Sequence, residues 1–106
     1  MQDISPRALR ERLDAESEPP LLLDVREPWE FAICRIPGAR HIPMREIPRR
    51  QAGLDRSRET VVICHHGIRS LQVGLYLERM GHQQVLNLQG GIAAWAEQVD
   101  QQMATY

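Results

Sequence analysis

Short apolar runs alternate with amphipathic stretches along the 106-residue chain. The run at 21–25, which carries one acidic residue near its end, and the run at 60–63 have the length and apolar character of parallel strands covered on both faces. Weaker strand signals lie at 39–42 and 85–88. Because strands alternate with helical patterns, right-handed crossovers within one parallel sheet are expected.

Helical patterns fill the stretches between these runs. Ser5 followed by Pro6 is typical of an N-cap with proline at the first helical position, and this helix should end before the prolines at 19–20. Further helices are expected at 28–33, 44–52 and 69–80, and from Ile92 onward. The pattern predicts an α/β fold: a doubly wound, mainly parallel sheet of about five strands with helices on both faces, as a single domain over 1–106.

Several large side chains outside the strands are expected in the core. In the helix at 69–80 the expected buried face consists of Leu71, Gly74, Leu75, Tyr76 and Leu77, and Gly81 should end the helix. The aromatic residues expected in the core are Trp29, Phe31 and Trp95.

Charge and composition narrow the range of functions. Thirteen basic and 14 acidic residues give a net charge of -1, which does not favour nucleic-acid binding. The apolar runs are too short to cross a membrane and the first residues lack a signal-peptide pattern, so a cytoplasmic protein is expected. Cys34 and Cys64 fit neither a C-x-x-C nor a metal-finger spacing, and at least one free thiol is therefore expected.

Cys64 is the residue most indicative of chemistry. It directly follows the apolar run at 60–63 and precedes a short loop and a helix start that carries Arg69. Backbone N–H groups of such a loop, the helix dipole and a nearby arginine all lower a thiol pKa. Ligands of parallel sheets bind at the carboxyl ends of strands, where the pattern brings Cys64, Asp24 and the glycines at 90–91 together.

Four motifs occur in order along the chain: Asp24-Val25-Arg26-Glu27-x-x-Glu30-Phe31, Ile36-Pro37-Gly38-Ala39, Cys64-x-x-Gly67-x-Arg69-Ser70 and Asn87-Leu88-x-Gly90-Gly91-Ile92-x-x-Trp95. With these motifs the chain resembles a single-domain rhodanese from about Ser5 to Trp95. The resemblance implies a sulfurtransferase that moves a sulfane sulfur from thiosulfate or a persulfide donor to cyanide or a thiol acceptor. The implied mechanism is ping-pong, through a persulfide on the active cysteine, with no metal or organic cofactor.

Roles for individual residues follow from the motifs and their chemistry. Cys64 is the expected nucleophile, and Arg69 is the expected principal anchor for an anionic donor. Asp24 and Arg26 are expected to form a buried or half-buried ion pair that positions the loop. The expected anion-binding loop comprises His65, His66, Gly67, Ile68, Arg69 and Ser70. Its two histidines are expected to add partial positive charge or to be simply solvated, and not to bind metal.

Three alternatives remain open from the sequence. A cysteine phosphatase would have a C-x5-R loop, whereas four residues separate Cys64 from Arg69 here, so the loop should fit sulfur better than phosphate. Rhodanese-like domains also serve as non-catalytic binding modules or as relay modules in sulfur-transfer pathways. In the relay case, a sulfur-relay protein would be the partner that completes the small site.

Cys34 departs from the family pattern. Cys34-Arg35 stands where related sequences commonly have Gly-His before Ile-Pro-Gly-Ala, so those two family residues have no counterpart here. Cys34 is interpreted as a partly buried spectator thiol. The alternative is a cysteine that resolves the Cys64 persulfide.

Overall fold

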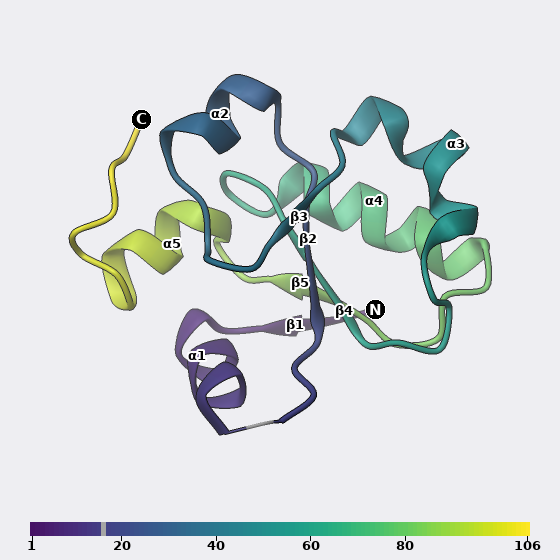
Figure 1. The fold of residues 1–106 in the computed structure, drawn as a ribbon, viewed down its shortest axis with the longest axis horizontal. Helices are drawn as coiled ribbons and strands as arrows, with labels where there is room; N and C mark the ends of the chain where they lie inside the picture. Colours follow the sequence, from purple (N-terminus) through teal and green to yellow (C-terminus); the bar gives the residue numbers. More distant parts are fainter. Residues whose placement is uncertain (16) are drawn as a thin grey trace.

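The protein folds around a five-stranded parallel sheet in the computed structural model, which describes residues 1–15 and 17–106 (Figure 1). Within these residues the strand order is β1-β5-β4-β2-β3, and every pairing is parallel. The strands are β1 (Gln2–Ile4), β2 (Leu21–Asp24), β3 (Arg40–His41), β4 (Thr60–Ile63) and β5 (Val85–Leu88). The predicted α/β class with a parallel sheet is confirmed.

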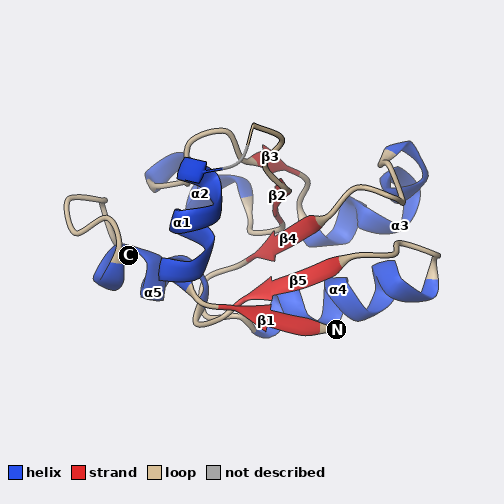
Figure 2. Cartoon of the chain, turned by 90° about the horizontal axis from the view of Figure 1, so that it is seen from below, coloured by secondary structure: helices blue, strands red, loops and turns tan. Residues whose placement is uncertain are grey.

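Helices cover both faces of the sheet (Figure 2). The helices are α1 (Pro6–Ala15), α2 (Pro28–Ile33), α3 (Ile47–Arg50), α4 (Ile68–Arg79) and α5 (Gly91–Gln98), with 3₁₀ turns at Met44–Glu46 and Gln51–Gly53. The Ser5 side chain caps α1 as predicted, because its Oγ accepts a hydrogen bond from the N–H of Ala8 at 3.1 Å.

Two separate apolar cores explain why the central strands are apolar throughout. Leu22 and Val61 pack with Leu9 of α1 and with α5 on one face, whereas Leu23 and Val62 pack with α3 and α4 on the other. Neighbouring strand residues point to opposite faces, so a strand covered on both sides has no polar face. Each fully buried aliphatic side chain contributes roughly 1.5–3 kcal/mol through removal from water.

The N-terminal strand was not predicted. β1 lies at the edge of the sheet, and its one neighbour among the described residues is β5. Gln2 and Asp3 are exposed and only Ile4 is buried, which leaves no alternating pattern long enough to indicate a strand.

The buried face of α4 also differs from the prediction. Leu71 and Leu75 are 42% and 44% exposed, and the side chains that face the sheet include Val73 and Leu77. The true buried face follows positions 70, 73, 74 and 77 and includes a serine and a glycine, which hydrophobicity alone does not mark. Among the predicted core aromatics, Trp95 is buried but Trp29 is 59% exposed.

The parallel arrangement places the strand ends that carry polar motifs at one edge of the sheet. The first residues after β2, β4 and β5 are Val25, Cys64 and Gln89. None of the helices that the structure describes is long and apolar enough to cross a membrane.

Candidate active site

The loop after β4 surrounds the sulfur of Cys64 with hydrogen-bonding groups. The Gly67 N–H donates to Cys64 Sγ at 3.0 Å, and the Ser70 hydroxyl lies 3.2 Å from the same sulfur. Cys64 is 1% exposed. A backbone donor at this distance stabilises negative charge on the sulfur where little water reaches it, and the hydroxyl does the same when its proton faces the sulfur.

Gly67 gives the loop its shape. Its φ of 102° lies in the left-handed region, and it caps the start of α4. Residues other than glycine adopt this conformation at a cost, because the Cβ approaches the backbone. The turn points the Gly67 N–H at Cys64 Sγ. Because α4 begins directly after Gly67, Ser70 in its first turn lies beside the same sulfur.

Asn87 of β5 fixes the loop from the neighbouring strand. Its Nδ2 donates to the Gly67 carbonyl at 3.2 Å, which turns its Oδ1 toward Ser70, whose hydroxyl donates to it at 2.5 Å. Asn87 begins the last of the four sequence motifs, but no role was predicted for it. A polar residue that is 7% exposed inside an apolar strand is the signal that identifies it.

The start of α5 holds the loop after β4 in place through backbone hydrogen bonds. The N–H groups of Ile92 and Ala93 donate to the carbonyls of Cys64 and His65 at 2.8 and 3.1 Å. A Cβ on Gly91 would collide with these two loop carbonyls. The expectation that the glycines at 90–91 lie beside Cys64 is therefore confirmed at Gly91, where only a residue without a Cβ allows so close an approach.

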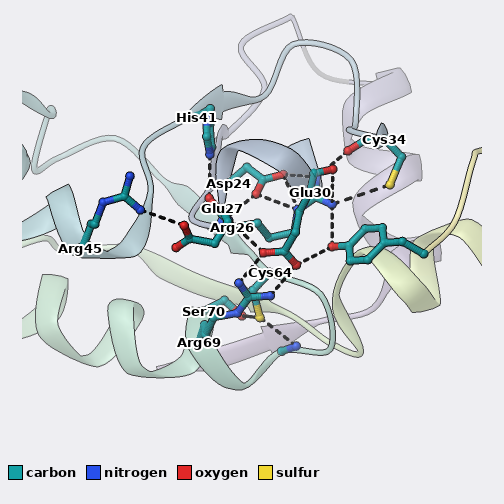
Figure 3. A network of polar contacts seen from close by, with 12 residues as sticks. Asp24, Arg26, Glu27, Glu30, Cys34, His41, Arg45, Cys64, Arg69 and Ser70 are labelled. Atoms are coloured by element: carbon teal, nitrogen blue, oxygen red, sulfur yellow. Dashed lines mark hydrogen bonds and ion pairs between the residues drawn. The ribbon is translucent and has the colours of Figure 1, made fainter. Parts of the chain in front are cut away.

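Arg69 pairs with a buried carboxylate. Its two terminal nitrogens donate to the two oxygens of Glu30, at 2.6 and 2.9 Å (Figure 3). Hydrogen bonds from Arg69 lower the pKa of Glu30 to about 2, against the opposing effect of burial. The same contact raises the pKa of Arg69. The expected anion anchor is thus already neutralised by a residue of α2, to which no role was assigned from the sequence.

The predicted ion pair between Asp24 and Arg26 is confirmed and is fully buried. Arg26 Nη2 lies 2.7 Å from Asp24 Oδ2, and both side chains are 0% exposed. A second bond from Nη2 reaches the Cys34 carbonyl at 2.6 Å. Burial alone would lower the pKa of Arg26, but its hydrogen bonds with Asp24 and Tyr106 outweigh burial and raise it. The pair ties the end of β2 to the segment that follows α2.

The Tyr106 hydroxyl group joins the two ion pairs. Its hydroxyl accepts from Arg26 Nη1 at 2.9 Å and donates to Glu30 Oε2 at 2.8 Å. Its ring stacks on His65, with 4.3 Å between ring centroids. Burial raises the Tyr106 pKa to about 12, so the hydroxyl keeps its proton. No local pattern predicts this contact, because 76 residues separate Tyr106 from Glu30.

The two histidines of the loop differ in exposure. Their rings stack on each other, with centroids 4.0 Å apart. His65 is half-buried and its pKa is lowered, first by burial and then by the neighbouring His66, so His65 is mainly neutral at pH 7. For His65, a lowered pKa does not favour the first of the two expectations, partial positive charge near neutral pH. His66 is exposed.

Cys34 borders the polar network formed by Asp24, Arg26, Glu30, Arg69 and Tyr106. It is 9% exposed, and its Sγ is 3.7 Å from Arg26 Nη1. It lines a small cavity of about 90 Å³ that His65 and Tyr106 also line. Cys34 and Cys64 are both free thiols. The burial expected for Cys34 is confirmed. Its interpretation as a spectator thiol stays a prediction, with a resolving cysteine as the alternative.

Sequence and structure comparisons place the chain among known proteins. Residues 5–98 match the model of the rhodanese-like domain. The chain belongs to this family. It is 43% identical over 96 residues to a protein named sulfurtransferase in Allochromatium vinosum, with 91% of this chain and 89% of the relative covered.

Two further comparisons agree with the family assignment. The chain is 33% identical over 75 residues to the thiosulfate sulfurtransferase GlpE of Stutzerimonas stutzeri, with 71% of this chain and 69% of the relative covered. Its structure is similar to that of a rhodanese-like domain protein from Staphylococcus aureus, with a TM-score of 0.84 and 36% identity. That match covers 90% of this chain and 91% of the solved one.

Proposed function

We propose that this rhodanese-like protein is a sulfurtransferase whose Cys64 carries the transferred sulfur as a persulfide. The proposal rests on the surroundings of the Cys64 sulfur. A backbone N–H and a hydroxyl group lie within 3.2 Å of it, in a loop at the carboxyl end of a central strand. Relatives named as sulfurtransferases support the general activity. The donors proposed are thiosulfate or a persulfide, and the acceptors are cyanide or a thiol.

The first half-reaction loads the cysteine. The Cys64 thiolate attacks the outer sulfur of thiosulfate, a new S–S bond forms, and sulfite leaves with the electron pair of the broken S–S bond. The product is an anionic persulfide. The Gly67 N–H and the Ser70 hydroxyl lie against Cys64 Sγ, where they stabilise the thiolate before it attacks and when it is restored.

The second half-reaction discharges the persulfide. Cyanide or a thiolate attacks the outer sulfur, and the bond between the two sulfurs breaks with its electron pair left on Cys64. Thiocyanate or a new persulfide is released, and the thiolate is restored. Because the donor's remainder leaves before the acceptor reacts, the kinetics are ping-pong.

Two other functions fit the Cys64 loop less well. A non-catalytic binding or relay module would not turn over small donors, yet this chain retains the thiol and the groups that stabilise its charge. A phosphatase would need a cradle for a tetrahedral phosphoryl group, and the loop has one residue fewer than the C-x5-R pattern.

Steady-state thiocyanate formation from thiosulfate and cyanide tests the proposal. Wild type and Cys34→Ser should turn over with parallel double-reciprocal plots, and Cys64→Ser should be inactive. Hydrolysis of a phosphotyrosine mimic by wild type, lost in Cys64→Ser and without thiocyanate formation, would establish the phosphatase instead. Inactivity with thiosulfate and with every persulfide donor would leave the binding module as the better account.

A further inference from the structure

The charged side chains of the candidate site neutralise one another. Arg69 is the cation nearest in sequence to the Cys64 loop, and both of its terminal nitrogens are taken up by Glu30. Arg26, the other cation of the network, is paired with Asp24. The charges of these four side chains therefore add up to zero, and the ion pairs give the loop no excess positive charge.

Glu30 is held firmly in its position. It is 3% exposed, and it accepts hydrogen bonds from the Glu27 N–H at 2.9 Å and from the Tyr106 hydroxyl at 2.8 Å, in addition to those from Arg69. Hydrogen bonds from these three residues hold the carboxylate beside Arg69. Glu30 also stays ionised, since its pKa is about 2.

The residues next to this ion pair in sequence are apolar and exposed. Trp29, which precedes Glu30, is 59% exposed, and Ile68, which precedes Arg69, is 70% exposed. Trp29 also contacts Tyr106 edge to face, with 5.4 Å between ring centroids. A small doubly charged anion gains little from apolar side chains, whereas a donor with an organic group gains from covering them.

We propose that Glu30 is a specificity-determining residue, which neutralises Arg69 and so shifts the donor preference of Cys64 from dianions such as thiosulfate toward monoanionic organic persulfides and thiosulfonates. The inference rests on the proposed function and narrows its donor class. Thiosulfate and methanethiosulfonate provide a matched pair of probes, because one charged oxygen of the first is a methyl group in the second. With either probe, Cys64 gains the terminal sulfur, and sulfite or methanesulfinate leaves with the bonding electrons.

The test is kcat/KM for both probes, with saturating cyanide as acceptor. Glu30→Gln removes one negative charge while keeping the shape and a hydrogen-bond acceptor for Arg69. The ratio of kcat/KM for thiosulfate to that for methanethiosulfonate should rise about fivefold, from the interaction of one unit charge at short range in a partly solvated site. The rise should shrink when the salt concentration increases. Intrinsic differences in reactivity cancel, because only the change in the ratio is compared.

Two further variants keep the test falsifiable. Arg69→Gln leaves Glu30 unneutralised, so the ratio should fall, which is the opposite direction and does not depend on the stability of Glu30→Gln. Glu59→Gln is the matched control: Glu59 pairs with Arg12 and immediately precedes β4, so it lies at the opposite end of the strand from Cys64. Its ratio should equal that of wild type.

An unchanged ratio in Glu30→Gln, or equal losses with both probes, would overturn the inference and show that the pair only positions the loop. Failure of wild type to form thiocyanate from either probe would instead contradict the proposed sulfurtransferase activity itself. The two failures are therefore distinguishable.

Discussion

Ser70 shows how a single side chain serves both the sulfur and the fold. Its hydroxyl lies 3.2 Å from Cys64 Sγ and donates to Asn87 Oδ1, and the residue is 0% exposed. When negative charge develops on the sulfur, the one hydroxyl proton can turn toward it, and Asn87 remains bonded to the Gly67 carbonyl. Ser70 therefore belongs with the groups that act directly on the reacting sulfur.

Replacing Ser70 by alanine tests this role. Ser70→Ala should lower kcat/KM for sulfur transfer about ten- to hundredfold, because a hydrogen bond to a charged group contributes roughly 1.5–3 kcal/mol. Ser57→Ala, at an exposed serine that bonds Asp55, is the control and should keep wild-type kinetics. Equal kcat/KM for Ser70→Ala and wild type would show that the hydroxyl does not stabilise the sulfur.

Single residues that local patterns mark were predicted, and those that depend on distant contacts were not. Cys64 and the Asp24–Arg26 pair each stand at the end of an apolar run, where a polar residue is conspicuous. Glu30 and Tyr106 are equally part of the polar contacts at the site, but their partners lie far away in sequence. Glu30 is 39 residues from Arg69, and Tyr106 is 76 residues from Glu30. Nothing in the spacing around either residue indicates these partners.

At the scale of elements, the start of α4 couples the fold to the site. Gly67 ends the loop in the left-handed conformation and begins the helix that holds Arg69 and Ser70. The strand–loop–helix order was evident from the sequence because an apolar run changes to a helical pattern there. Which side of α4 is buried was not evident, since Leu71 and Leu75 are exposed while Ser70 and Gly74 face inward.

Gly67→Ala tests the backbone contribution of this turn. It should lower the free energy of unfolding by about 1–2 kcal/mol, because a Cβ is strained at a φ of 102°. Urea unfolding measures the change. Gly53→Ala is the matched control, since a Cβ there meets no atom within 4 Å and its φ is not positive, and its stability should not fall by as much. Equal stability of the two variants would mean that Gly67 is not strained by a side chain.

At the scale of the whole molecule, one polar network ties together segments that are far apart in the chain. Through Arg26, Glu30, Arg69 and Tyr106 it connects the end of β2, α2, the start of α4 and the C-terminal segment. The sheet and its covering helices were predictable because apolar runs of strand length determine them. The network was not, because it forms only when the finished sheet brings these segments to one edge.

Because of Glu30, the free energy of unfolding should vary with pH in the acid range. The folded-state pKa of about 2 is below the ordinary glutamate value of 4.5, so this carboxylate stabilises the fold above pH 4.5, and the stabilisation is lost as pH falls toward 2. Urea unfolding at several pH values should show a smaller loss between pH 5 and pH 2 for Glu30→Gln than for wild type. Identical pH profiles would show that Glu30 is not coupled to folding in this range.

The central claim is that Cys64 carries the transferred sulfur, and intact-protein mass spectrometry after incubation with thiosulfate or methanethiosulfonate tests it most directly. Wild type and Cys34→Ser should each gain one sulfur, about 32 Da, that cyanide removes as thiocyanate, and Cys64→Ser should gain none. Sulfur loading that persists in Cys64→Ser, or that disappears in Cys34→Ser, would contradict the account.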